Sequence, residues 1–256
     1  MTQLERLDSL LALLLEEQSK EGIKVPDAPE EKKRLLRSLF NLRPPLPADK
    51  TLLAIQDEYL KEEINSRGIT RLQDLTPIQD HLYLWQGDIT ALECGAIVNA
   101  ANNQLLGCFV PCHRCIDNAI HTFAGIQLRL ACYDLMKGQG APEPAGGAKI
   151  TPAFNLPSRF VLHTVGPVIS GALTNRDCEL LASCYRSCLV LAEQRGIDSI
   201  AFCCISTGEF HFPRDRAAEI AVQTVKGYLR ASNSEIKVVF NVFQDEDYEH
   251  YKRLLS

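Results

Sequence analysis

Residues 97–121 read IVNAANNQLLGCFVPCHRCIDNAIH, and they join an expected strand, a loop and the start of a helix. It begins inside the segment 96–100, whose continuous apolar character is typical of a strand buried on both faces. An asparagine-rich turn follows, then a loop with three cysteines and one histidine, and then Asp117 at the expected start of a helix. In open α/β sheets, ligands bind at such strand–loop–helix connections. The stretch therefore predicts a class of fold and also the position of a binding site.

From residue 82 onward, the pattern alternates between short apolar strands and longer helices. The expected strands are 82–85, 96–100, 149–151, 159–165, 199–205 and 237–243, and the expected helices are 117–137, 177–194, 213–229 and 246–255. This alternation predicts an α/β fold with a mostly parallel sheet that is covered by helices on both faces.

The first 75 residues have a different pattern. Leucines at three- and four-residue spacing predict a helix at 3–20, and a second helix is expected at 29–42 with Pro29 in its first turn. A third helix should begin after the N-cap residue Asp49 and end before Gly68. We therefore expect a helical extension over 1–75, with a docking or partner-binding role, and an α/β domain over 76–256.

Composition and charge exclude several classes of function. The formal net charge is -5 and no basic run occurs, which argues against a general binder of nucleic acid or of anionic membranes. No segment approaches the roughly 18 apolar residues of a membrane helix, and acidic residues flank the leucine-rich leader. We therefore expect a cytoplasmic protein with reduced thiols. Most of the ten cysteines then fit buried core positions, namely Cys94, Cys132, Cys184, Cys188, Cys203 and Cys204.

The remaining thiol cluster, in what we call the thiol loop (residues 108–115), does not fit that interpretation. Cys108, Cys112, His113 and Cys115 fall within eight residues, and thiolate and imidazole are the ligands that zinc prefers. The spacing is too short for a structural finger, whereas one loop can supply three ligands and leave one position open. We predict Cys108, His113 and Cys115 as the ligands, because Cys112 directly follows Pro111. A redox pair of Cys112 and Cys115, or thiols without a metal, are the alternatives.

Asp117 would lie close to Asn99, Asn102 and Asn103, because the turn and the helix start both follow the strand at 96–100. Taken alone, a carboxylate at a helix start is often an N-cap, and an asparagine in a turn is often structural. The convergence of amides, thiols and a carboxylate at the end of one strand favours a ligand site.

Three other strand ends carry polar or aromatic residues. The strand at 199–205 runs into the small-residue turn 206–210 (STGEF), whose N–H groups would form an anion site suited to phosphates. Asp88, after the strand at 82–85, could accept from an amine or hydroxyl of a ligand. Phe243, at the end of the last strand, could stack on a base or belong to the core.

Six motifs occur in order along the chain: GDIT at 87–90, IVNAAN at 97–102, IDNAIH at 116–121, FVLHTVGP at 160–167, ISTG at 205–208 and NVFQDEDY at 241–248. Together they resemble a macrodomain, the ADP-ribose-binding fold, over roughly residues 80–256. The resemblance implies a three-layer α/β/α domain with a mixed, mostly parallel sheet, preceded here by the helical extension.

The same resemblance implies which residues bind ADP-ribose. Asp88 would hold the adenine amine, Asn99 and Asn102 would lie by the distal ribose, and Phe243 would pack on the adenine. The turn that begins at Ser206 would wrap the diphosphate. The implied ligand-binding set is Asp88, Ile89, Asn99, Asn102, Ser206, Thr207, Gly208, Glu209, Phe210 and Phe243.

One departure from the family pattern concerns the thiol loop. In hydrolases of the MacroD type, an all-glycine loop precedes the catalytic acid that matches Asp117, whereas this chain has CFVPCHRC at 108–115. Together with the helical extension, this looks like the zinc-dependent macrodomain subgroup of microbes. The resemblance implies a Zn²⁺ cofactor on Cys108, His113 and Cys115.

The expected activity is hydrolysis of mono-ADP-ribose from acidic side chains of modified proteins. Asp117 would position or activate a water, Asn102 would orient the ribose, and zinc would act as a template or Lewis acid. The subgroup is associated with a sirtuin-class ADP-ribosyltransferase and with lipoyl-carrier substrates. A non-catalytic ADP-ribose reader with a structural zinc, and an O-acetyl-ADP-ribose deacetylase, are the alternatives.

Overall fold

The computed structural model describes residues 1–20 and 22–256 and contains a six-stranded sheet in the order β2-β8-β7-β4-β6-β5. Its strands are β2 (Leu82–Gln86), β4 (Ala96–Ala100), β5 (Ala148–Pro152), β6 (Phe160–Thr164), β7 (Ser199–Phe202) and β8 (Lys237–Val242). Five of them are parallel, and β5 runs antiparallel to β6. The predicted α/β class with a mixed, mostly parallel sheet is confirmed.

The central strands are short, apolar and buried on both faces. All four residues of β7 are buried, as are the first four of β4. Strand β7 ends at Phe202, three residues before the predicted end, because the chain leaves the sheet there for the turn that contains Ser206. Cys204, on this exit, is half-buried, whereas the other five cysteines expected in the core are buried.

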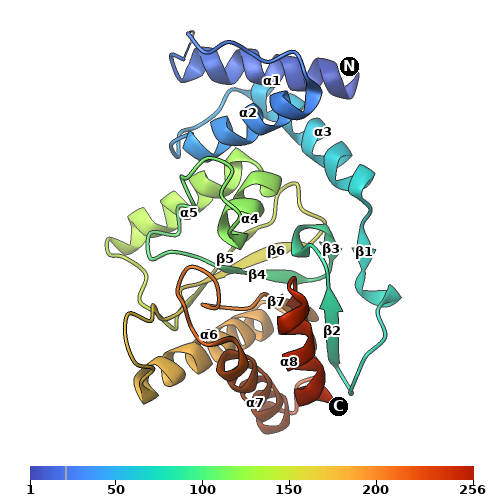
Figure 1. The fold of residues 1–256 in the computed structure, drawn as a ribbon, viewed down its shortest axis with the longest axis vertical. Helices are drawn as coiled ribbons and strands as arrows, with labels where there is room; N and C mark the ends of the chain where they lie inside the picture. The colour runs from blue at the N-terminus through green and yellow to red at the C-terminus, as the bar shows by residue number, and fades with distance from the viewer. Residues whose placement is uncertain (21) are drawn as a thin grey trace.

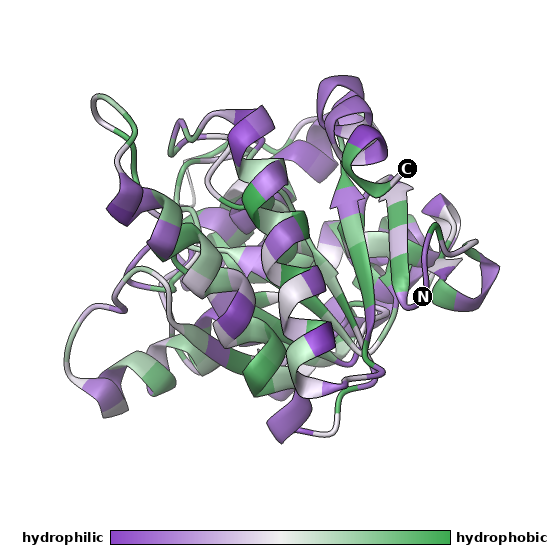
Figure 2. Cartoon of the chain, turned by 90° about the horizontal axis from the view of Figure 1, so that it is seen from below, coloured by the Kyte–Doolittle hydropathy of each residue, from purple (hydrophilic) through white to green (hydrophobic). Residues whose placement is uncertain are grey.

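Two layers of helices cover the sheet. Helices α4 (Ile116–Ala124) and α5 (Ile126–Gln139) lie on one face, and α6 (Asn175–Gln194), α7 (Arg214–Ser232) and α8 (Asp245–Leu255) lie on the other (Figure 1). Figure 2 shows hydrophobic residues along the strands and hydrophilic residues on the outer turns of the helices. This arrangement is the predicted three-layer α/β/α order.

The prediction of a single helix at 117–137 is wrong, because the helix is interrupted at Gly125, between α4 and α5. Gly125 has φ 96° and ψ 171°, a region that is essentially restricted to glycine. A Cβ at this position would lie 2.7 Å from the Gln127 Oε1 and Gln56 Nε2 atoms. Helix α5 then continues through Gly138 and ends before Gly140, which has the left-handed conformation.

The helical extension consists of α1 (Gln3–Glu17), α2 (Pro29–Leu42) and α3 (Lys50–Arg67), and it covers the outer side of α4 and α5 (Figure 1). Asp49 caps α3 as predicted, by accepting from the Thr51 N–H. The first helix ends at Glu17, three residues before the predicted end. Leu14 and Leu15, in its last turn, are buried in the core of the extension.

The extension and the α/β domain share buried residues. Ile126 of α5 belongs to the hydrophobic cluster of the extension, and Ile64 of α3 belongs to the main core. A two-stranded parallel pair, β1 (Thr70–Arg71) and β3 (Leu92–Glu93), also joins the two parts and was not predicted. The boundary between residues 75 and 76 stays a prediction.

Across residues 1–20 and 22–256, no helix combines the length and the apolar character that would let it span a bilayer.

Candidate active site

Four parallel strands deliver the predicted site residues to one edge of the sheet. Asp88 follows β2, Asn102 follows β4, Ser206 follows β7 and Phe243 follows β8. The carboxyl ends of parallel strands meet at the same edge, so residues that are up to 155 positions apart in sequence gather there. The rest of the site is built around Asp117, in the first turn of α4.

Asp117 is buried between two asparagine amides. Only 5% of its surface is exposed. The Asn99 Nδ2 donates to Asp117 Oδ1 at 2.8 Å, and the Asn102 Nδ2 is 3.3 Å from Oδ2. The N-cap of α4 is Cys115, whose sulfur accepts from the Asn118 N–H, so the alternative that Asp117 is a helix cap is wrong.

Burial raises the pKa of the Asp117 carboxyl to about 6. The hydrogen bond from Asn99, the positive charge of Arg129 and the hydrogen bond from Asn102 each oppose this rise in pKa. The group is therefore ionised at neutral pH, yet its pKa lies close enough to neutrality for it to exchange a proton. This is the behaviour expected of a general base or acid rather than of a surface carboxylate.

Two neutral histidines lie beneath Asp117. Burial lowers the pKa of His163 to about 3 and also lowers the pKa of His121 well below its ordinary value. Asn99 donates to His163 Nδ1 at 3.2 Å, which leaves the proton on Nε2, 2.9 Å from the Thr151 hydroxyl. The His121 Nε2 is 3.5 Å from Asp117 Oδ1, but a neutral imidazole forms no ion pair. Cys132 lies with these histidines, and its sulfur is 3.7 Å from His163 Nε2, whereas neither ring nitrogen of His121 has a hydrogen-bond partner among the described residues.

The thiol loop brings its three predicted ligands together. The donor atoms of Cys108, His113 and Cys115 all lie within 4.8 Å of one another. The Cys112 sulfur turns away to α2, where it lies 3.3 Å from the Ser38 hydroxyl. The structure thus groups the three residues chosen from the sequence and separates the fourth.

The donor set fits a divalent metal such as zinc. Two thiols and one imidazole are ligands that zinc accepts, and the His113 Nδ1 is buried without a hydrogen-bond partner. Burial, with further effects from Cys108 and Asp117, raises the pKa of the Cys115 thiol to about 12. A bound cation would offset this cost of ionising the buried thiol, because a cation stabilises thiolates. Zinc binding itself stays a prediction.

Gly107 allows the thiol loop to cross close above α4. Its φ is +78°, and a Cβ would lie 2.7 Å from the Cγ atom of the His121 ring. The Gly107 carbonyl also accepts from Asn102 Nδ2 at 3.0 Å. The start of the loop is therefore fixed to the same asparagine that bonds Asp117.

The predicted phosphate turn lies beside the thiol loop. Ser206 has φ 65°, and its carbonyl accepts from the Phe212 N–H at 3.0 Å. The Glu209 Oε1 is 3.6 Å from His113 Nε2, and Gly208 faces open space. The Ser206 hydroxyl is buried without a hydrogen-bond partner and faces Gly166, where a Cβ would lie 1.9 Å from it. Binding of phosphate by Ser206, Thr207, Gly208, Glu209 and Phe210 stays a prediction.

At the other end of the site, Asp88 is held by two neighbours. Its Oδ1 accepts from the Thr90 N–H at 2.9 Å, and its Oδ2 is 2.9 Å from the Arg67 Nη1. Arg67, from α3, also lies 3.8 Å above the ring of Phe123. Sequence reasoning missed Arg67, because no local pattern connects the end of the extension to residue 88.

The other two predicted residues near Asp88 differ in exposure. Ile89 is buried in the main core, so a ligand contact from it would have to come from its main chain. Phe243 is 71% exposed, and the alternative that it is a core residue is wrong.

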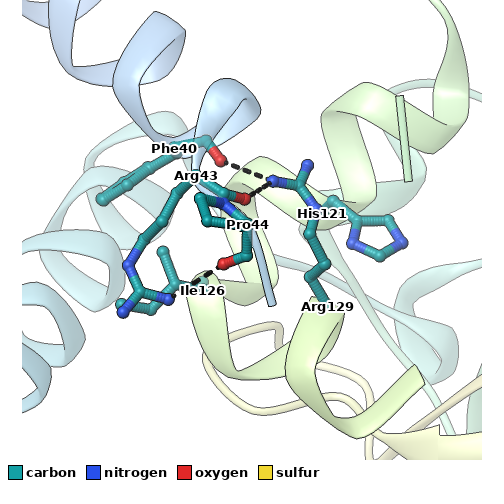
Figure 3. A pocket seen from close by; sticks show the side chains of 7 residues that line it. Phe40, Arg43, Pro44, His121, Ile126 and Arg129 are labelled. Carbon is teal, nitrogen blue, oxygen red and sulfur yellow. Dashed lines mark hydrogen bonds between the residues drawn. The ribbon is translucent and has the colours of Figure 1, made fainter. Parts of the chain in front are cut away.

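Arg129 is a further residue that sequence reasoning missed. Its Nε donates to the Leu106 carbonyl at 2.7 Å, at the start of the thiol loop, and its guanidinium donates to the carbonyls of Phe40 and Arg43 in the extension. Figure 3 shows the bonds from Arg129 to the Phe40 and Arg43 carbonyls beside a cavity of about 10 Å³, lined also by His121, which is the size of one water position. The sequence gives no sign of these contacts, because the three acceptors of the Arg129 hydrogen bonds are main-chain carbonyls, which every residue has.

A groove of about 500 Å³ lies at the opposite, amino-terminal edge of the strands. Arg71, Tyr83, Arg159 and Lys237 contribute to its lining. None of the predicted site residues borders it, so the chemistry described above belongs to the carboxyl edge alone.

Comparison with known proteins gives consistent similarities. The macro domain family model matches residues 98–221. A protein-ADP-ribose hydrolase of Treponema medium is 56% identical, with 100% of both chains covered. One of Staphylococcus aureus is 49% identical over 98% of this chain and 95% of its own. A probable bifunctional ADP-ribose hydrolase/ADP-ribosyltransferase of Fusarium oxysporum f. sp. cubense is 41% identical over 87% of this chain and 40% of its own length.

Solved structures agree with these sequence relatives. The Oceanobacillus iheyensis macrodomain with ADP is 38% identical, with a TM-score of 0.63 over 71% of this chain and 93% of that one. The Trypanosoma brucei macrodomain in complex with ADP-ribose is 29% identical, with a TM-score of 0.67 over 90% of this chain and 97% of that one.

Proposed function

The chain belongs to the macro domain family, and from this premise we propose that it is a hydrolase that removes mono-ADP-ribose from acidic side chains of modified proteins. The observation that carries the proposal is the buried Asp117 carboxylate, held between the amides of Asn99 and Asn102 beside the thiol loop. Relatives that match over nearly their whole length are named protein-ADP-ribose hydrolases.

In this proposal, ADP-ribose lies along the carboxyl edge of the sheet. Asp88 accepts from the adenine amine, and the exposed ring of Phe243 packs on the base. The turn that begins at Ser206 receives the diphosphate, and the distal ribose reaches Asn102. This order follows the strand order, because β2 and β8 lie at one side of the sheet and β4 lies nearer the middle.

Asp117 then acts on the bond to the target protein. The oxygen of a water bonds to the carbon of the distal ribose as the bond from that carbon to the side-chain carboxylate breaks, and Asp117 accepts the proton of that water. The carboxylate leaves as an anion, so the reaction needs an ordered water and a fixed ribose more than a strong acid. The pKa of Asp117, raised to about 6, leaves the group ionised and able to take up the proton near neutrality.

Cys108, His113 and Cys115 would hold a zinc ion in this proposal. When bound, zinc supplies a positive charge that orients a ribose hydroxyl or a water in its open coordination position. The protein's own part is to keep the three donor atoms within 4.8 Å of one another, the last of them on Cys115, two residues before Asp117.

The proposed partner is a mono-ADP-ribosylated protein, with a lipoyl-carrier protein as the first candidate. A sirtuin-class ADP-ribosyltransferase would supply this substrate. The similarity to a probable bifunctional ADP-ribose hydrolase/ADP-ribosyltransferase supports a functional link between the two activities.

The test is release of ADP-ribose from a protein modified on glutamate or aspartate. Purified enzyme, with its metal content measured, is compared before and after removal of the metal by a chelator, and again after addition of Zn²⁺. We expect release by the zinc-containing protein, loss after chelation and recovery with Zn²⁺. A rate that is unchanged by chelation would contradict the role of zinc, and no release at all would contradict the hydrolase.

Two controls separate the alternatives. A protein modified on serine or arginine tests whether the leaving carboxylate is required. O-acetyl-ADP-ribose, added as a competitor and assayed as a substrate, tests the deacetylase. A reader would bind ADP-ribose tightly in a titration and release none from any of these substrates.

A further inference from the structure

Helix α2 of the extension contacts the thiol loop through one arginine. The guanidinium of Arg37 donates to the main-chain carbonyl of His113 at 3.0 Å. It also donates twice to the side-chain oxygen of Asn118, at 2.7 and 3.1 Å. The planar fork of arginine suits this pattern, because one group can serve several fixed acceptors at once.

Asn118 passes this contact on to the other two candidate ligands. Its side chain is fully buried, and its Nδ2 donates to the Val110 carbonyl at 3.0 Å and lies 3.5 Å from the Cys108 carbonyl. Its main-chain N–H donates to the Cys115 sulfur at 3.4 Å. Arg37 therefore reaches His113 directly, and it reaches Cys108 and Cys115 through one intervening residue.

A second side chain of α2 fixes the middle of the loop. The Asn41 Oδ1 accepts from the Cys112 N–H at 2.9 Å, and its Nδ2 donates to the Thr122 hydroxyl at 3.0 Å. Cys112 has φ 53°, a conformation that non-glycine residues seldom adopt. Asn41 is only 1% exposed. The turn is thus held in an unfavourable conformation by a buried bond from the extension.

The loop depends on these bonds because it has no helix or strand of its own between β4 and α4. Loop carbonyls and N–H groups that lack regular partners must be satisfied by side chains or water. Here the side chains come from a helix about 75 positions earlier in the sequence. Groups behind the ligands of a metal site orient those ligands and tune its affinity.

We propose that Arg37, assisted by Asn41, is a positioning residue that holds Cys108, His113 and Cys115 in the arrangement that takes a divalent metal. The extension is then part of the site rather than a separate docking module. The consequence for catalysis rests on the proposed function, whereas the effect on metal binding does not.

The experiment measures the dissociation constant of Zn²⁺ by competition with a chromophoric chelator, on full-length protein. The variants are Arg37→Ala, Arg37→Lys and the control Arg34→Ala, which removes the same charge from an exposed position one turn earlier on α2. We expect Arg37→Ala to weaken Zn²⁺ binding about 10–100-fold, as is usual for groups behind metal ligands. Lysine should restore only part of the affinity, because a single ammonium cannot span both acceptors, and Arg34→Ala should bind like the wild type.

Asn118→Asp distinguishes positioning from simple docking of the extension. The new carboxylate keeps the acceptor for Arg37 and so keeps α2 attached, but it removes the donor to the carbonyls of Val110 and Cys108. Positioning predicts weaker Zn²⁺ binding in this variant too, at an unchanged far-UV circular dichroism spectrum. If Arg37→Ala does not fold, the Zn²⁺ affinity of Asn118→Asp still tests whether these bonds position the loop.

The outcomes separate this inference from the proposed function. Wild-type Zn²⁺ affinity in Arg37→Ala or in folded Asn118→Asp, or no Zn²⁺ binding by the wild type, overturns the inference, even if the enzyme is an active hydrolase. Weakened Zn²⁺ binding in both variants supports the inference, even if no ADP-ribose is released from any substrate.

Discussion

Asp117 has the burial, the raised pKa and the two amide neighbours of a proton-transfer group. Replacement by asparagine keeps its shape and removes the charge, so it should lower kcat/KM by about 10²–10⁴-fold, the usual contribution of such a group. The control is Asp134→Asn, at an exposed position on α5. Release of ADP-ribose from a carboxylate-modified protein is the measurement. Full activity of Asp117→Asn would mean that the carboxylate has a structural role and transfers no proton.

His163 makes stability depend on pH. Its folded pKa of about 3 lies below the ordinary 6.5, so between these values the unfolded chain binds a proton that the folded chain does not. Its contribution to stability is complete above pH 6.5 and is lost as the pH falls toward 3. Between pH 3 and pH 6.5, the slope of the unfolding free energy against pH should therefore be smaller in His163→Gln, by up to about 1.4 kcal/mol per pH unit.

Urea unfolding of both proteins at several values of pH between 4 and 7 measures this slope. The comparison concerns the slope alone, because the variant also loses the hydrogen bonds to Asn99 and Thr151. Equal slopes would mean that His163 is not held neutral in the folded protein.

At the level of the elements, the interruption at Gly125 separates α4, which carries Asp117, from α5. Gly125→Ala should destabilise the protein by about 1–3 kcal/mol, because alanine does not tolerate φ 96° with ψ 171°. Gly138→Ala is the matched control inside α5, where a Cβ meets no atom within 4 Å. It should stabilise by about 0.5–1 kcal/mol. Chemical denaturation measures both, and a neutral Gly125→Ala would show that the break does not need glycine.

The thiol loop shows why elements of this kind escape sequence reasoning. Its residue types indicated a metal, because ligand chemistry is carried by side chains, and the position of Cys112 directly after Pro111 separated it from the other three. Its support could not be foreseen, since Arg37, Asn41 and Arg129 bond to residues far along the chain, and several of these partners are main-chain groups. Any sequence presents such carbonyls, so no pattern marks them.

At the scale of the whole molecule, the extension and the α/β domain should unfold together. Ile64 and Ile126 each pack in the core of the other part, and Arg129 bonds across the interface. Leu14→Ala, at a fully buried position of α1, should cost about 2–5 kcal/mol. It should also shift the unfolding of the sheet, although Leu14 is remote from it.

Two probes measure this coupling. Trp85, the single tryptophan, lies in β2 and reports on the sheet, while circular dichroism at 222 nm reports on all helices. Coincident transitions in both proteins are expected. Loss of helix signal before the tryptophan signal in Leu14→Ala would mean that the extension unfolds independently.

The residue pattern alone predicted the α/β class, the mostly parallel sheet and the meeting of Asn102, Asp117 and the thiol loop at the end of one strand. The fold class follows from apolar periodicity, and the meeting follows from the order of residues along one strand–loop–helix connection, both of which are local properties. That Asp88 and Ser206 belong to the same site was implied by the macrodomain resemblance. Three features were visible only in the folded protein: α4 and α5 are separate helices, Arg67 pairs with Asp88, and α2 supports the thiol loop. The contacts of Arg67 and of α2 join distant segments, and their energies depend on distance in space, so they leave no trace in local sequence. The break has a local mark in Gly125, but a glycine alone does not show where a helix ends, since α5 continues through Gly138.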